Sequence, residues 1–199
     1  MNAKRLEAIL ATEFPAGEGE MVQRFQKLRD SGLLPVSRGR NAQQISRDHA
    51  VSGLLSVVSH RPSSAGVAAT MLRDLVPVGG SETGFARAST LAQALRLVLA
   101  DRALLDSLVE IRLTENKVHS NAVGRASIFF VQRQAELATY YVQRTATSLL
   151  QPDAEQTYDP MDLSSAVIRE TVMVPRLLRH ISWELARDEA RALEMAVTP

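Results

Sequence analysis

The chain has 199 residues, a net charge of +1, 45% hydrophobic residues and 23% charged residues, which are ordinary values for a folded soluble protein. It has no cysteine, which excludes disulfides, a thiolate nucleophile and a cysteine-based zinc site. No apolar run approaches the ~20 residues that a membrane-spanning helix needs. Glu7 and Glu13 interrupt the apolar residues of the first segment, which argues against a secretory signal. We therefore expect a cytoplasmic protein with no membrane partner.

The charges are divided unevenly along the chain. Residues 21–61 carry seven cations and two carboxylates, a local charge of +5, whereas residues 150–199 carry five arginines and nine carboxylates, a local charge of −4. This division is typical of a DNA-contacting module joined to an acidic segment that faces a protein partner. The alternative is a charge fluctuation without functional meaning.

Three amphipathic helices are predicted before residue 62 from apolar residues at 3/4 spacing. The first covers residues 3–14 and the second residues 20–31, with Gly32 as its left-handed cap. The third begins with Ser46 as N-cap and ends near residue 60. Residues 36–45 have the composition of a tight hairpin or wing, and the competing interpretation is a solvated loop with incidental charge.

This region contains the residues that we expect to contact DNA. Arginine and lysine bind phosphates, and arginine, asparagine and glutamine also bind base edges. On the second helix the cations are predicted to lie off the buried stripe. Gly39, between two arginines, would let the backbone approach a phosphate closely. The predicted DNA-binding set is Arg24, Lys27, Arg29, Arg38, Arg40, Asn41, Gln43, Gln44 and Arg47.

Residues 28–58, LRDSGLLPVSRGRNAQQISRDHAVSGLLSVV, resemble the helix–wing–helix part of MerR-type regulators. Members of that family have a Leu-Arg helix ending in Gly-Leu-Leu-Pro, a basic wing and a helix capped by serine or threonine. The tyrosine that usually follows the Leu-Arg pair is replaced by Asp30 and Ser31, and the long coiled-coil dimerisation helix is missing downstream. A winged helix from a phage or mobile-element regulator fits the same residues. The matching positions are Leu28, Arg29, Gly32, Leu33, Leu34, Pro35, Arg38 and Arg40.

Beyond residue 62 the pattern changes from helices to strands. A short helix is predicted over residues 67–76, and residues 90–108 form one helix or a pair broken at Asp101. Apolar residues then alternate over residues 109–113, which predicts a half-exposed strand. Residues 126–131 and 137–142 are rich in β-branched and aromatic residues, and complete a predicted antiparallel meander.

Further predictions concern the segments around and after the meander. The competing interpretation of residues 132–150 is a helix, because good helix formers occur there. Residues 115–117 are predicted as a turn, and residues 176–195 as a last amphipathic helix after Pro175. Trp183 lies just off the apolar stripe of that helix and is assigned to the core or to a subunit interface.

No catalytic motif is present in the sequence. The four histidines are scattered, and no Walker A, Gly-x-Gly-x-x-Gly, Gly-x-Ser-x-Gly or His-Glu-x-x-His pattern occurs. Asp159 and Asp162 are close in sequence but lack partners for acid–base chemistry. We therefore predict no catalytic residues, no metal site and no cofactor, and interpret the chain as not an enzyme.

These observations predict an α+β protein in three parts. Residues 1–62 form a winged helix-turn-helix DNA-binding module, residues 63–84 a short helix and linker, and residues 85–199 an α+β oligomerisation or regulatory module with a small antiparallel sheet and C-terminal helices. The expected function is sequence-specific binding of double-stranded DNA in transcriptional control, as a homodimer. The acidic C-terminal region is a candidate surface for a protein partner. The alternatives are a protein-interaction adaptor that uses the winged-helix surface, and a phage DNA-packaging or recombination accessory factor.

Overall fold

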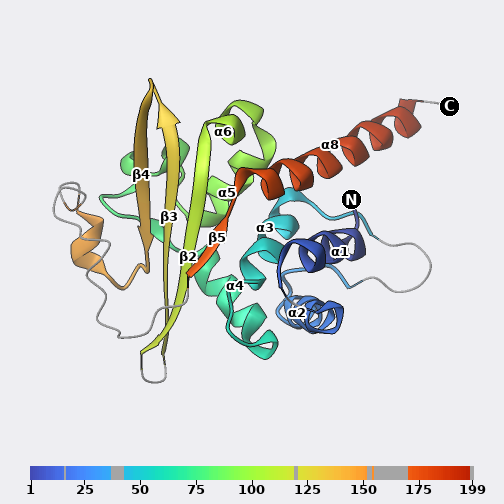
Figure 1. The fold of residues 1–199 in the computed structure, drawn as a ribbon, viewed down its shortest axis with the longest axis horizontal. Coiled ribbons are helices and arrows are strands. Elements are labelled where there is room, and N and C mark those ends of the chain that lie inside the picture. The colour runs from blue at the N-terminus through green and yellow to red at the C-terminus, as the bar shows by residue number, and fades with distance from the viewer. Residues whose placement is uncertain (16, 37–42, 119–120, 152–153, 155–169, 198–199) are drawn as a thin grey trace.

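The computed structural model describes the chain except for residues 16, 37–42, 119–120, 152–153, 155–169 and 198–199. The long helices gather on one side of an antiparallel sheet (Figure 1), so the predicted α+β class is confirmed. In chain order the elements are α1 (Ala3–Glu13), α2 (Glu18–Asp30), α3 (Arg47–Ser56), η1 (Pro62–Ser64), α4 (Ala65–Arg73), β1 (Val76–Pro77), η2 (Ser81–Thr83), η3 (Phe85–Arg87), α5 (Leu91–Ala100), α6 (Arg102–Ser107), β2 (Leu108–Val118), β3 (Asn121–Gln132), β4 (Ala135–Val142), η4 (Thr147–Leu150), β5 (Glu170–Met173) and α8 (Pro175–Val197), where η marks a 3-10 helix.

The first three predicted helices are confirmed, with ends set by local capping. The side chain of Asn2 accepts the Arg5 N–H at the start of α1. Gly32 follows α2 with φ of 70°, a left-handed conformation that glycine adopts without steric cost. Ser46 forms a capping box with His49 at the start of α3, in which each side chain bonds the other residue's backbone N–H.

Helix α3 occupies the centre of the helical layer. Every residue from Ala50 to Ser56 is buried, because small residues let the neighbouring helices approach from all sides. Gly53 shows how close this packing is, since a Cβ there would lie 2.6 Å from Leu6 Cδ2 on α1. The helix therefore serves as a core element with no broad exposed face.

The sheet has the strand order β1-β4-β3-β2-β5 in the described residues. Strands β2, β3 and β4 form the predicted antiparallel meander, with Ile128 of β3 opposite Ile111 of β2 and Thr139 of β4. The competing helix over 132–150 is wrong for the residues of β4, and β2 continues through the predicted turn at 115–117. The inward-facing residues Ile111, Leu113, Ile128 and Tyr141 are all buried against the helices. The short edge strands β1 and β5 were not predicted.

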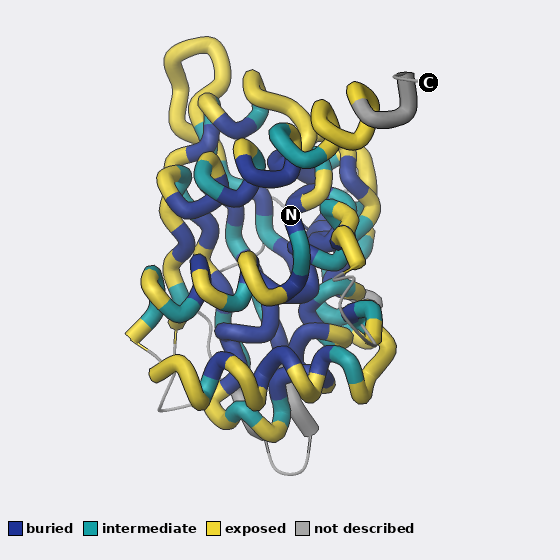
Figure 2. The backbone as a smooth tube through the Cα atoms, turned by 90° about the vertical axis from the view of Figure 1, so that its right-hand side faces the viewer, coloured by how far each residue is buried: buried dark blue, intermediate teal, exposed yellow. Residues whose placement is uncertain are grey.

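The predicted boundaries at residues 62 and 85 have no counterpart in the core. One cluster of buried apolar side chains runs from Met1 on the N-terminal side to Leu185 on α8, through both the helices and the sheet. Figure 2 shows this continuous buried interior beneath an exposed periphery. Helix α3 packs directly on α5, and α1 packs on α8, so elements from the first and last predicted parts share this core.

The winged helix-turn-helix arrangement is not confirmed. Residues 31–46 separate α2 from α3, whereas a helix-turn-helix joins its helices by a turn of about 3–4 residues. Residues 37–42 of the predicted wing lie outside the described residues. Gln44, at the end of that segment, pairs with Asn2 as an isolated antiparallel bridge.

None of the described helices combines the length and the apolar character that crossing a bilayer requires.

Candidate functional site

Arg24, predicted to contact DNA, lies in the protein interior. Its side chain is 2% exposed, and its guanidinium donates to Ser56 O at 2.6 Å, to Ser59 Oγ at 2.6 Å and to Ser59 O at 3.0 Å. It also pairs with Glu20 at 2.6 Å. The cation thus satisfies carbonyl groups at and just beyond the C-terminal end of α3, where unpaired carbonyls and the helix dipole favour positive charge. The expectation that Arg24 lies off the buried stripe of α2 is therefore wrong, and its guanidinium faces carbonyl groups of the chain itself.

Two other predicted cations lie at the surface but are paired within the chain. Arg47 makes a bidentate contact with Glu189 of α8, at 2.6 and 2.8 Å. Lys27 pairs with Asp30 one turn along α2, at 3.0 Å. Both ion pairs are at the surface, where such pairs contribute little to stability, so a phosphate can compete with them. Arg47 and Lys27 can therefore still contact DNA, although the paired carboxylates reduce the positive charge around them.

Two further cations lie close to the segment that joins α2 to α3, Arg29 just before it and Lys4 two residues after Asn2, which pairs with Gln44. Arg29 is partly exposed on the last turn of α2, and Lys4 is exposed on α1. Burial raises the pKa of the Glu7 carboxyl against the opposing fields of Arg29 and Lys4, which places both cations near the same carboxyl group. Sequence analysis missed Lys4, although its position opposite the apolar stripe of residues 3–14 was a signal for an exposed cation.

The segment that carries Arg38, Arg40 and Asn41 lies outside the described residues, but both of its ends are anchored. We call residues 36–44 the basic connection. Leu34 before it is 2% exposed and Ile45 after it is 6% exposed. The Ile45 N–H donates to Met1 O at 2.9 Å, and the Met1 amino group pairs with Asp188 on α8.

Within the basic connection, Gln43 and Gln44 are exposed at the described end. The residues on either side of the connection are therefore fixed in place, Leu34 by burial and Ile45 by burial and by its hydrogen bond with Met1.

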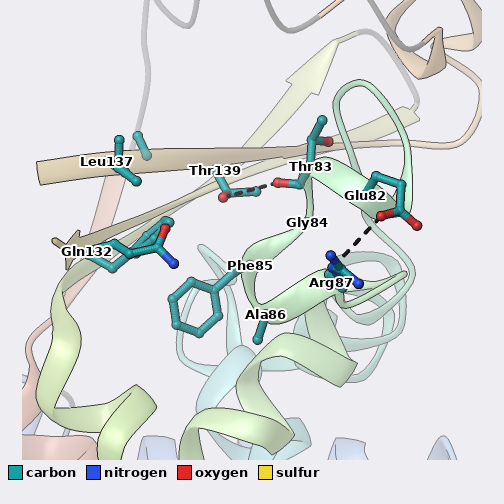
Figure 3. Close-up of a pocket in the computed structure, with 11 residues that line it drawn as sticks. Glu82, Thr83, Gly84, Phe85, Ala86, Arg87, Gln132, Leu137 and Thr139 are labelled. Carbon is teal, nitrogen blue, oxygen red and sulfur yellow. Dashed lines mark hydrogen bonds and ion pairs between the residues drawn. The ribbon is translucent and has the colours of Figure 1, made fainter. Parts of the chain in front are cut away.

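A hollow of about 560 Å³ opens between the η2–η3 segment and the ends of β3 and β4 (Figure 3). Phe85 and Phe130 meet edge to face in its wall, with ring centroids 4.9 Å apart. Glu82 and Arg87 stand at its rim, 3.9 Å apart and largely exposed. The hollow is lined by Glu82, Thr83, Gly84, Phe85, Ala86, Arg87, Phe130, Gln132, Leu137, Ala138 and Thr139.

The backbone at this hollow has an unusual conformation. Ala86 and Arg87 both have positive φ, 51° and 57°, which costs a non-glycine residue roughly 1–2 kcal/mol. Tyr141, fully buried beneath, holds the segment because its hydroxyl oxygen accepts the Phe85 N–H at 3.0 Å. Burial raises the pKa of the Tyr141 hydroxyl far above its usual value, so the group remains a neutral phenol.

The side chains that line the hollow can contact a ligand, but they do not form a nucleophile–base pair of the kind used in catalysis. The Thr83 hydroxyl donates to Val78 O and Gly80 O, and the Thr139 hydroxyl donates to Thr83 O. The Glu82 carboxylate, the Arg87 guanidinium and the aromatic wall remain, and groups of these kinds can contact a ligand through charge and stacking. In the described part of the chain, no group of three or more His, Asp or Glu residues is arranged to hold a metal ion.

Comparison with known proteins finds no matching family model, no matching curated protein and no matching solved structure. The resemblance of residues 28–58 to MerR-type regulators therefore stays a prediction from the sequence.

Proposed function

We propose that the protein binds double-stranded DNA through the basic connection and the surface beside it, and acts in transcriptional control. The observation that carries the proposal is the anchoring of this connection. Leu34 and Ile45 are buried on either side of a segment whose side chains include Arg38 and Arg40. A basic segment with fixed ends can present its arginines to DNA at a lower entropic cost than a free tail.

The burial of α3 changes the expected mode of binding. A helix that is buried from Ala50 to Ser56 cannot enter a major groove, so α3 is not proposed as a recognition helix. The proposal assigns groove contacts to the basic connection instead. Arginine suits a narrow minor groove, where the negative potential is strongest, and Asn41 and Gln43 are suited to base edges.

Described cations beside the connection supply the positioning contacts. Lys4 and Arg29 share the neighbourhood of Glu7, and Arg47 begins α3 directly after the connection. Contacts of this kind fix a protein on the duplex without carrying sequence information. The proposed interface therefore combines cations on the helices with groove-contacting groups in the connection.

The test is a selection from a randomised DNA pool with purified full chain, followed by affinity measurements. Arg38→Ala combined with Arg40→Ala is expected to abolish specific binding and to leave the melting temperature nearly unchanged. The matched control is Arg102→Ala combined with Arg144→Ala, which removes two exposed cations from α6 and from the end of β4.

The control variant should retain affinity within about threefold, since a distant surface charge contributes little. An equal loss of DNA affinity in both double variants would show that binding depends on overall positive charge and not on the basic connection. A DNA affinity that is unchanged in the first variant would refute the role of the connection, and would leave the protein-interaction adaptor as the function to test.

A further inference from the structure

The hollow between residues 82–87 and the ends of β3 and β4 has the size and lining of a small-molecule site. Its volume of about 560 Å³ falls within the roughly 300–1,000 Å³ of protein pockets that hold small ligands. Leu137 lines the hollow and is 42% exposed, and Phe130, its partner across the two strands, is partly exposed. Apolar surface is thus left in contact with water at a concave site, and a ligand that covers it gains hydrophobic free energy.

The backbone that forms one wall of the hollow is strained. Ala86 and Arg87 are consecutive, both have positive φ and both are exposed, so the left-handed conformation buries neither side chain. The Arg87 N–H donates to Gly84 O at 2.8 Å, and the Ala88 N–H donates to Phe85 O at 3.0 Å, which makes two tight turns in succession. Strain of this kind is concentrated at ligand clamps and active sites, where it positions binding groups.

The two turns place opposite charges side by side at the rim. Glu82 Oε2 and Arg87 Nε are 3.9 Å apart, and both side chains are 82% exposed. A ligand with a carboxylate alone would be attracted by Arg87 and repelled by Glu82, and a ligand with an ammonium alone would meet the reverse. A zwitterion avoids both conflicts, because its carboxylate can lie against Arg87 while its ammonium lies against Glu82. The rim therefore favours a ligand that carries both charges close together.

We propose that the hollow binds a small zwitterion with an aromatic ring, that is, an aromatic α-amino acid. Figure 3 shows Glu82 and Arg87 at one end of the hollow, Leu137 at the other end and Phe85 between them. The charged groups of the ligand lie at the first end, and its ring extends toward Phe85 and Leu137. Phe85 and Phe130 already meet edge to face, with centroids 4.9 Å apart, and the ring of the ligand adds a further aromatic contact to this pair.

This site does not depend on DNA binding, and either proposal can fail without the other. Strands β3 and β4 lie across the molecule from α1 (Figure 1), whereas the basic connection is tied to Asn2 at the start of α1 through Gln44. A ligand in the hollow therefore leaves the proposed DNA interface uncovered.

The test is isothermal titration calorimetry of the full chain at neutral pH with four probes. L-Phenylalanine has both charges and the ring, hydrocinnamate lacks the ammonium, phenethylamine lacks the carboxylate, and L-leucine replaces the ring by an aliphatic chain. L-Phenylalanine is expected to bind tightest. Each singly charged probe should bind about fivefold more weakly, the value of one exposed ion pair. L-Leucine should bind about threefold more weakly, because it loses the aromatic contact.

Two charge variants test the assignment of the rim. Arg87→Gln should lose the preference for L-phenylalanine over phenethylamine and keep the preference over hydrocinnamate, because Glu82 still repels a lone carboxylate. Glu82→Gln should show the opposite pattern. Arg133→Gln is the matched control, since Arg133 is also an exposed arginine with positive φ, 51°, and lies outside the lining of the hollow. Its preferences should equal those of the wild type.

A third variant tests the apolar end. Leu137→Ala should weaken L-phenylalanine binding about fivefold, whereas Val131→Ala, which shortens a similarly exposed residue of β3 outside the hollow, should not. A wild-type chain that binds none of the four probes up to their solubility limits would overturn the site. Equal affinities for L-phenylalanine and L-leucine would overturn the aromatic specificity, and unchanged preferences in both rim variants would overturn the recognition of a zwitterion.

Discussion

Replacing Arg24 by methionine is expected to destabilise the whole protein. Methionine retains most of the side-chain length and removes the guanidinium. Ser56 O keeps a donor in the hydroxyl of Ser59, whereas the carbonyl of Ser59 loses the guanidinium that donates to it at 3.0 Å. A buried carbonyl left without its donor costs about 1–3 kcal/mol, and a charge-assisted hydrogen bond contributes about 1.5–3 kcal/mol.

The expected loss for Arg24→Met is therefore about 3 kcal/mol of unfolding free energy. The contact with Glu20 adds little, because that carboxylate is 38% exposed and water can replace its partner. At roughly 2–4 °C per kcal/mol for a chain of this length, the melting temperature should fall by roughly 6–12 °C.

Thermal and urea unfolding followed by circular dichroism measure this loss. Arg61→Met is the control, because Arg61 is exposed and its change should stay within about 0.5 kcal/mol. Below its melting temperature the Arg24→Met chain should bind DNA like wild type. Melting curves that coincide for the Arg24→Met and Arg61→Met chains would refute the structural role, and lost DNA affinity in a folded Arg24→Met chain would return this residue to the interface.

Three further changes test the core and its ion pairs. Leu34→Asp should unfold the chain at neutral pH, because an unpaired carboxylate at a site that is 2% exposed costs several kcal/mol, and wild-type circular dichroism would show that the connection is not anchored there. Tyr141→Phe should cost about 1–3 kcal/mol by leaving the Phe85 N–H without its acceptor, with calorimetry as the measurement and an unchanged melting temperature as the contrary result. Burial raises the pKa of Glu184, but its hydrogen bond with Arg5 and the nearby cations outweigh burial and lower it overall, so this carboxylate stabilises the fold above its unfolded-state pKa of about 4.5. Glu184→Gln should therefore be less stable than wild type at pH 7 and approach it as the pH falls below 4.5 and through the lowered pKa of Glu184, and parallel pH profiles of stability would contradict this.

Local patterns in the sequence were enough to predict most elements. The 3/4 spacing of apolar residues and the capping residue Ser46 predicted the N-terminal helices, and alternation predicted the meander β2–β4. Strands β1 and β5 are too short for periodicity, since β5 spans Glu170–Met173 and pairs with β2 through a long-range contact. Such short edge strands form because they pair with a neighbouring strand, β4 for β1 and β2 for β5, and not because of a pattern in their own residues.

The spacing of apolar residues in α2 indicated that Arg24 is buried, but its charge suggested a surface position. Arg24 follows Met21 by three residues and precedes Leu28 by four, so it lies on the apolar stripe of α2. The carbonyl groups at the end of α3 were available as its partners only in the folded chain. The hollow beside Phe85 could not be predicted, because it joins residues 82–87 to residues 130–139, and alanine carries no sequence signal for the left-handed conformation found at Ala86.

The salt dependence of DNA affinity tests the central proposal most directly. The logarithm of the binding constant should fall linearly with the logarithm of salt concentration, with a slope of about −0.9 for each phosphate contacted. Arg38→Ala combined with Arg40→Ala should make that slope shallower by about 2, while Arg102→Ala combined with Arg144→Ala should leave it unchanged. A slope near zero for the wild-type chain, or the same slope in both double variants, would contradict binding of DNA through the basic connection.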